Sequence, residues 1–250
     1  MTDTLQRHDI LMLVHDRPIY LYMTLDSLRR ATRSPYRLTV FHHPSGDPLV
    51  PQVLRGFVAR GVIDRIIEIP DETVDYVKLL RSARALGLRD REFFFWIEDD
   101  VVIEPDSRCW IEKMRAAFRA DDRLAMVGSA IDKSDFIDPE ALREALGRDL
   151  TPEELAEIKA PSPERHQQFE NGEMVGRTHG VAGRFMGLRS AAITDDIVNL
   201  DYLMNISLRK AGWTTRVLAD VRHRHLSLQN YYDYPDYTAR RDLHINRNRR

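Results

Sequence analysis

The chain has 250 residues, with 37 basic and 39 acidic side chains and a formal net charge of −2. This length fits one large α/β domain, and the balanced charge excludes a global field that would draw the whole molecule to nucleic acid or an anionic membrane. The single cysteine, Cys109, excludes an internal disulfide framework and an all-cysteine zinc site, and it favours a reducing compartment.

The N-terminus lacks a basic segment followed by an apolar one, and no apolar run approaches the ~18 residues that a membrane-spanning helix needs. We therefore expect a soluble, cytoplasmic protein.

In the first 130 residues, short apolar runs alternate with longer amphipathic stretches. This pattern is typical of βα units that build a mostly parallel sheet flanked by helices. Pro18 suits the first turn of a helix. We expect strands at 10–14, 37–41, 65–69 and 92–97, with helices after Pro18, near 50–60 and at 73–86.

The rest of the chain divides into further predicted segments. A helix at 107–120 and a strand at 124–129 precede a polar, charged segment, 131–178, which we interpret as an insertion or lid with helices at 139–146 and 151–158. Sheet-like sequence returns at 180–188, followed by a helix at 199–211 that ends at Gly212 and a strand at 214–225. The tail, 226–250, is aromatic and then basic.

Three adjacent acids follow the buried strand "FFFWI": Glu98, Asp99 and Asp100. Ligands of open α/β sheets bind outside the carboxyl ends of the strands, which is where these side chains lie. Adjacent carboxylates repel one another unless a cation or donor groups neutralise them, and Mg²⁺ or Mn²⁺ prefers carboxylate oxygen. A metal site is therefore predicted, with a solvated acidic turn as the alternative.

Two later segments carry further candidates. Asp201 lies near the start of an amphipathic helix, and the strand after that helix ends at His223 and His225, which share one strand face. A neutral imidazole is a metal ligand and a general base near neutral pH. For His223 we favour a solvated strand edge, and for His225 a functional role.

These segments together resemble the GT-A glycosyltransferases, most closely the inverting family 2 enzymes that use nucleotide-diphosphate sugars. "LVHDRPIYLYMTLDSLRRAT" resembles the family's first strand and helix, "FWIEDDV" its metal-binding acidic motif, and "LDYLMNISLRKAGW" its catalytic helix. The Glu-Asp-Asp form is also similar to that of N-acetylglucosaminyltransferases. The resemblance covers nearly the whole chain except 131–178, and it implies a single GT-A domain with a nucleotide-sugar-binding half, 1–130, and an acceptor half, 179–225.

The resemblance implies a role for each matched residue. Asp100 and His225 would hold Mn²⁺ or Mg²⁺, and Asp201 would be the general base, with Asp195 and Asp196 as fallbacks. Glu98 and Asp99 would contact the ribose or the metal's water shell. The residues implied to contact the nucleotide sugar are Val14, His15, Arg17, His42, Glu98, Asp99 and Arg184.

Several residues depart from the family pattern or keep an alternative. His42 stands where the family has an aspartate that reads the nucleobase, and His15 replaces a tyrosine. Arg17 would reach the diphosphate or lie on the surface at the start of a helix. The glycines around Arg184 either let the backbone approach a ligand or belong to a kinked core strand. Trp96 and the phenylalanines before it are expected in the core.

The implied reaction is metal-dependent transfer of a hexosyl or N-acetylhexosaminyl group to a glycan, lipid-linked or small-molecule acceptor. One alternative is a sugar nucleotidyltransferase of related fold, which would normally carry a glycine-rich loop that "HDRPIY" lacks. Another is a non-enzymatic binder of nucleic acid or an anionic surface acting through the basic tail. The near-neutral charge argues against nucleic acid as a partner. We expect the tail instead to be a loop or short helix that folds over the donor site, or a peripheral membrane contact near a lipid-linked acceptor.

Overall fold

The computed structural model describes residues 7–43, 47–69, 91–131, 143, 147–152, 165–170, 173–179, 181, 183–194 and 202–226. The predicted helix at 73–86, almost all of the predicted helices at 139–146 and 151–158, and the tail after residue 226 lie outside these residues. Among the described residues, no helix is long and apolar enough to span a membrane.

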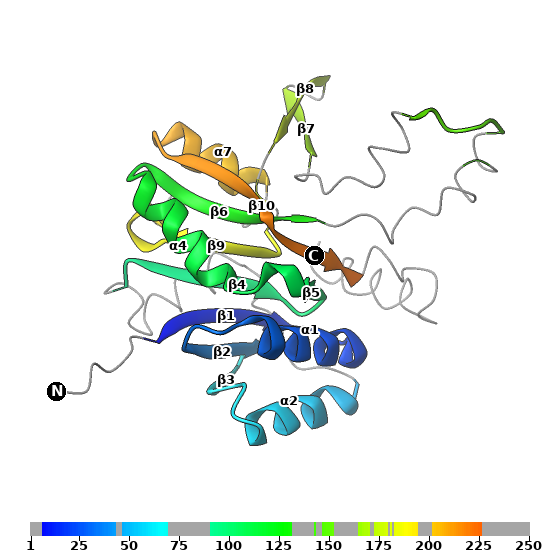
Figure 1. Cartoon of the computed structure of the whole chain (residues 1–250), viewed down its shortest axis with the longest axis vertical. Helices are drawn as coiled ribbons and strands as arrows, with labels where there is room; N and C mark the ends of the chain where they lie inside the picture. The colour runs from blue at the N-terminus through cyan, green and yellow to red at the C-terminus, as the bar shows by residue number, and fades with distance from the viewer. Residues whose placement is uncertain are drawn as a thin grey trace.

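Eight strands form one sheet in the order β3-β2-β1-β4-β9-β6-β10-β5 (Figure 1). In chain order they are β1 (His8–Val14), β2 (Tyr36–His42), β3 (Arg65–Glu68), β4 (Phe93–Glu98), β5 (Val101–Ile103), β6 (Leu124–Ile131), β9 (Phe185–Arg189) and β10 (Thr214–His225). β9 and β5 run against the other six strands. The mostly parallel sheet predicted from the sequence is therefore confirmed.

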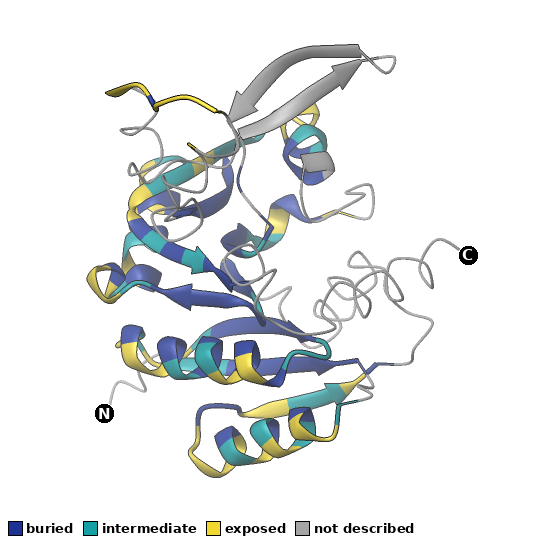
Figure 2. Cartoon of the chain, turned by 90° about the vertical axis from the view of Figure 1, so that its right-hand side faces the viewer, coloured by how far each residue is buried: buried dark blue, intermediate teal, exposed yellow. Residues whose placement is uncertain are grey.

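The helices cover both faces of this sheet. Alternate side chains of β1 point to opposite faces, so that Ile10 and Met12 pack with α1 (Pro18–Ala31), α2 (Leu49–Ala59) and α4 (Trp110–Ala120). Leu11 and Leu13 pack on the other face, with the helix α7 (Tyr202–Lys210). Figure 2 shows the strands largely buried between exposed outer helix faces. Both faces being covered explains why the strands are continuous apolar runs.

Aromatic rings fill the centre of the core. Trp110 meets the rings of Phe95 and Phe185 edge to face, at centroid distances of 5.0 and 4.8 Å. Trp96 is fully buried, which confirms its predicted place in the core. A Cβ on Gly187 of β9 would lie 3.0 Å from the ring of Phe118 and 3.2 Å from that of Phe95. This glycine is therefore explained by core packing.

Two differences from the prediction concern β5 and the 131–178 segment. The sequence did not predict β5, a strand of three residues. Within the predicted insertion, β7 (Arg165–Glu170) and β8 (Glu173–His179) pair as an antiparallel hairpin, which lies apart from the main sheet (Figure 1). The end of α7 agrees with the prediction, because Gly212 follows it with a φ of +85°.

Candidate active site

The acidic turn lies where the strand order of the sheet reverses. β2 and β3 extend to one side of β1 and β4 lies on its other side, so the segments that follow β1 and β4 meet at a topological switch point. Ligands of open α/β sheets bind at such points. Residues 15–17 follow β1, and Asp99 and Asp100 form the turn after β4.

β5 brings the distant histidine to this turn. It pairs antiparallel with the end of β10, so that His225 lies opposite Val101, directly after the acids. The backbone N–H of Leu226 donates to the carbonyl of Asp100 at 2.8 Å, which fixes the end of β10 against the turn. Two residues separated by more than a hundred positions, Asp100 and His225, are thereby held side by side.

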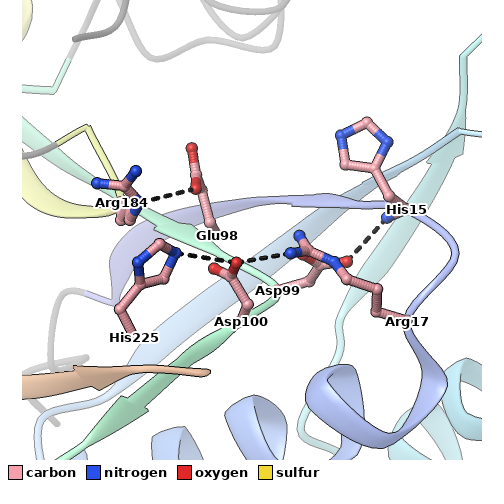
Figure 3. Close-up of polar contacts among 7 residues, drawn as sticks. All are labelled: His15, Arg17, Glu98, Asp99, Asp100, Arg184 and His225. Carbon is pink, nitrogen blue, oxygen red and sulfur yellow. Dashed lines mark hydrogen bonds and ion pairs between the residues drawn. The ribbon is translucent and has the colours of Figure 1, made fainter. Parts of the chain in front are cut away.

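Glu98, Asp100 and His225 form a group that could hold a metal ion. One potential ligand atom from each lies within 4.8 Å of the others. Nε2 of His225 is 3.0 Å from Oδ2 of Asp100, and both side chains are buried (Figure 3). Two carboxylate oxygens and an imidazole nitrogen are a donor set that a divalent transition-metal ion accepts. The residues present therefore fit the metal that the sequence predicted, with Glu98 joining the two expected ligands.

Arg17 lies against the same acids. Its Nη1 donates to Oδ2 of Asp100 at 2.6 Å, and its Nη2 donates to Oδ1 of Asp99 (Figure 3). Its side chain is only 16% exposed, so the surface alternative for Arg17 is wrong. The guanidinium neutralises part of the charge of two adjacent carboxylates, which is one of the two ways in which such a turn is stabilised.

Asp99 is the most buried of the three acids, at 1% exposure. Its Oδ2 accepts a hydrogen bond of 2.9 Å from the backbone N–H of His15, and its Oδ1 accepts from Arg17. Burial raises the pKa of Asp99, although the charge of Arg17 opposes that rise. Both oxygens are therefore bound by groups of the protein itself.

The electrostatics single out Glu98. Burial and the neighbouring charge of Asp100 raise the pKa of Glu98 to about 8, while Arg184 and Arg17 act in the opposite direction. Nε of Arg184 lies 3.9 Å from Oε2 of Glu98, and the Glu98 N–H donates to the Arg184 carbonyl at 2.8 Å. A carboxyl with such a pKa is mostly protonated at neutral pH unless a cation binds beside it.

The histidines expected to contact the donor lie at the ends of β1 and β2. The ring of half-buried His15 has its centroid 5.7 Å from that of the His43 ring. The backbone N–H of His43 donates to the carbonyl of Val14 at 3.1 Å. His42 is buried, with Nδ1 2.8 Å from Oε2 of Glu68. Val14 is fully buried, backbone and side chain alike, and it marks the end of β1 rather than an exposed contact.

The prediction of a solvated edge at His223 is wrong. The ring is fully buried, Nδ1 lies 2.8 Å from Oγ of Ser129, and that hydroxyl donates to the carbonyl of Phe185 at 3.0 Å. Ser129 therefore accepts from Nδ1–H of the imidazole. Burial and the nearby His225 lower the pKa of His223 to about 3. The sequence did carry a signal for the burial of His223: it shares a strand face with His225, for which a functional role was expected.

The predicted general base, Asp201, and its fallbacks Asp195 and Asp196 lie outside the described residues. Of the other predicted site residues, seven come together at one edge of the sheet, as Figure 3 shows: His15, Arg17, Glu98, Asp99, Asp100, Arg184 and His225.

Comparison with known proteins gives matches in structure alone. No protein-family model matches the sequence, and neither does any curated protein. The fold is similar to that of the mannosyltransferase PcManGT from Pyrobaculum calidifontis, solved with GDP-Man and Mn²⁺, with a TM-score of 0.57 and 14% identity over 96% of this chain. GalNAc-T7, solved with UDP, GalNAc and Mn²⁺, gives a TM-score of 0.54 and 11% identity over 90% of this chain.

This chain has the GT-A fold. A third similar structure, glucosyl-3-phosphoglycerate synthase from Mycobacterium tuberculosis, was solved with Mn²⁺, UDP and phosphoglyceric acid; its TM-score is 0.50 and its identity 12% over 88% of this chain. The chain spans 61% of the mannosyltransferase, 44% of GalNAc-T7 and 70% of the synthase. The fold class predicted from the sequence is thus confirmed, and in this GT-A sheet the acidic turn lies at the switch point.

Proposed function

We propose that the protein is a metal-dependent glycosyltransferase that moves a hexosyl or N-acetylhexosaminyl group from a nucleotide-diphosphate sugar to an acceptor hydroxyl, with inversion. The observation that carries this proposal is the group of half-buried Glu98 with buried Asp100 and His225, which lies at the switch point beside Arg17. Three proteins of similar fold were solved with Mn²⁺ and a nucleotide or nucleotide sugar, which supports the same class here.

The metal would be held by Asp100 and His225, and we add Glu98 as a third ligand. Carboxylate oxygen suits both Mg²⁺ and Mn²⁺, whereas imidazole nitrogen suits a transition-metal ion. The donor set therefore favours Mn²⁺ over Mg²⁺. When bound, the ion supplies positive charge that stabilises the leaving diphosphate.

The chain's own residues would bind the donor around this ion. Arg17 and Arg184 stand on opposite sides of the acids (Figure 3), where each guanidinium can meet a diphosphate oxygen. We propose that the end of β1 at Val14, with His15 after it and His42 at the end of β2, lines the nucleoside side.

In the transfer itself, the acceptor hydroxyl oxygen attacks the anomeric carbon as the bond to the diphosphate breaks. Asp201 would take the proton of that hydroxyl, an assistance of about 10²- to 10⁴-fold. We propose a glycan, a lipid-linked sugar or a small molecule as the acceptor, and the cytoplasm as the compartment.

The test is a panel of nucleotide sugars incubated with the full chain, with and without Mn²⁺, while release of nucleoside diphosphate is followed. We expect one donor to be turned over with metal, and Asp100→Ala and Asp201→Ala each to abolish turnover. Only Asp100→Ala should also abolish the metal-dependent part of donor binding. If no nucleotide sugar binds in the presence of Mn²⁺, the proposed function is wrong.

A second arm separates the proposal from a sugar nucleotidyltransferase. The protein is given nucleoside triphosphates with sugar 1-phosphates, and pyrophosphate is measured. A glycosyltransferase releases none under these conditions, whereas pyrophosphate release with an inert nucleotide-sugar panel would replace the proposal by the alternative.

A further inference from the structure

We propose that Asp99 is a positioning residue, which holds Arg17 against Asp100 and thereby sets the affinity of the metal site. This inference rests on the proposed metal-dependent function. It differs from the role implied by the sequence, in which Asp99 contacts the ribose or the metal's water shell.

The hydrogen bonds of Asp99 leave it facing the β1–α1 loop. Its two oxygens accept from the two ends of that loop, the backbone N–H of His15 and the guanidinium of Arg17. At 1% exposure the carboxylate lies beneath the loop. A ribose hydroxyl would reach this carboxylate only if the loop moved away from it, because almost none of the surface of Asp99 is exposed.

Arg17 transmits this anchoring to the candidate metal ligand. Its guanidinium is a rigid planar fork, and Nη1 and Nη2 bridge Asp100 and Asp99. The same Oδ2 of Asp100 that accepts from Nη1 at 2.6 Å lies 3.0 Å from Nε2 of His225. The orientation of the Asp100 carboxylate is therefore set on one side by Arg17 and on the other by His225.

The backbone around Arg17 restricts where its side chain can go. Arg17 immediately precedes α1, its carbonyl accepts from the N–H of Leu21 at 2.9 Å, and Pro18 fixes the first helical position. With the backbone held, the bonds to Asp99 and Asp100 orient the guanidinium. If the bond to Asp99 is lost, the guanidinium is free to turn about its remaining bond and to bind both oxygens of Asp100, where it competes with a metal ion for the carboxylate.

The test uses two substitutions that conserve charge, because a neutral replacement would weaken metal binding by removing an anion whatever its role. Asp99→Glu is too long to keep both bonds, and Arg17→Lys has no fork to bridge two carboxylates. Mn²⁺ affinity is measured calorimetrically without nucleotide. Groups that orient metal ligands typically change metal affinity 10- to 100-fold when replaced, so we expect each variant to bind Mn²⁺ at least about tenfold more weakly.

The double variant tests whether the two residues act through one bridge. We expect Asp99→Glu with Arg17→Lys to weaken Mn²⁺ binding no more than the weaker-binding single variant does, since the bridge can be broken only once. Losses that multiply would overturn the proposal, because they would show two independent contributions.

Asp9 provides a matched control at the other end of β1. It is also a buried aspartate that pairs with two arginines, Arg37 at 2.6 Å and Arg91 at 3.2 Å. Asp9→Glu should lower the thermal unfolding temperature as Asp99→Glu does, but leave Mn²⁺ affinity within about twofold of the wild type. A similar loss of Mn²⁺ affinity in Asp9→Glu would overturn the proposal by showing a general effect of destabilisation.

The outcomes separate this inference from the proposed function. Absence of Mn²⁺ binding by the wild type would overturn both. Suppose instead that Asp99→Glu binds Mn²⁺ as tightly as the wild type but binds UDP or GDP more weakly at saturating Mn²⁺. That result would overturn only the positioning role and would show that Asp99 contacts the nucleotide of the donor. If Asp99→Glu does not fold, Arg17→Lys decides: unchanged Mn²⁺ affinity in that variant refutes the bridge.

Discussion

Proton release on metal binding is the sharpest test of Glu98. Burial and the charge of Asp100 raise its pKa to about 8 in the metal-free protein. A group with that pKa is ionised in about a tenth of molecules at pH 7 and about a hundredth at pH 6. If Glu98 supplies a ligand oxygen, Mn²⁺ must displace its proton, and apparent affinity should rise about tenfold per pH unit up to about pH 8.

The measurement is calorimetric titration with Mn²⁺ at pH 6, 7 and 8, in two buffers that differ in ionisation enthalpy, so that protons released can be counted. Glu98→Gln is the matched variant, because its amide resembles the protonated carboxyl in size and has no proton to lose. At pH 7 we expect the wild type to release close to one proton more than Glu98→Gln. The difference isolates Glu98 from any proton released by His225.

The same shift predicts the stability of the metal-free protein. Because the folded-state pKa of Glu98 lies above its ordinary value of 4.5, its protonated form favours the folded state. Its contribution is fully present below about pH 4.5 and is lost as the pH rises through 8. Glu98→Gln should therefore unfold at a higher temperature than the wild type at pH 8 but not at pH 4.5.

Two results would refute this reasoning. Equal proton release by the wild type and Glu98→Gln would remove Glu98 from the ligand set and leave Asp100 and His225. Equal unfolding temperatures at pH 8 would show that the carboxyl is ionised at no cost, so that the surrounding charges outweigh its burial.

Two predictions concern the packing around Val181. Gly128→Ala should lower the free energy of unfolding by about 1–3 kcal/mol, because a Cβ there would lie 2.3 Å from Cγ1 of Val181. The control is Gly56→Ala in α2, where nothing lies within 4 Å of the added Cβ, and it should raise the free energy of unfolding slightly. Thermal unfolding of both variants measures the difference. Asn205→Ala should cost about 2 kcal/mol or more, because the Asn205 side chain accepts from the Val181 N–H at 3.0 Å and donates to its carbonyl at 2.9 Å; an unchanged denaturation midpoint would show that these groups find other partners.

The parallel strands β1, β2 and β4 could be predicted because each is marked by the residues of its own segment. β1, β2 and β4 are covered on both faces, so each is a continuous apolar run bounded by polar residues. The acids after β4 could be recognised for the same reason, because the change from an apolar run to three adjacent carboxylates takes place within ten residues.

β5 and the environment of His223 depend on distant pairing and could not be predicted. Val101–Ile103 is too short to signal a strand, and it becomes one because the end of β10 pairs with it. The alternation of arginine and histidine in β10 predicted that His223 and His225 share a face. Which face is buried depends on the register against β6, which shifts between Leu218 and Arg222.

The position of Arg17 depends both on the local sequence and on the pairing of distant strands. Its place after β1 is local, but its partners are 82 and 83 residues away, and only the sheet topology brings them within hydrogen-bonding distance. At neutral pH Glu98 is mostly protonated, so the charges of Asp99 and Asp100 balance those of Arg17 and Arg184. A divalent ion that displaces the Glu98 proton changes this sum from zero to +1. Under the proposed function, the turn therefore attracts an anionic donor only after the ion binds.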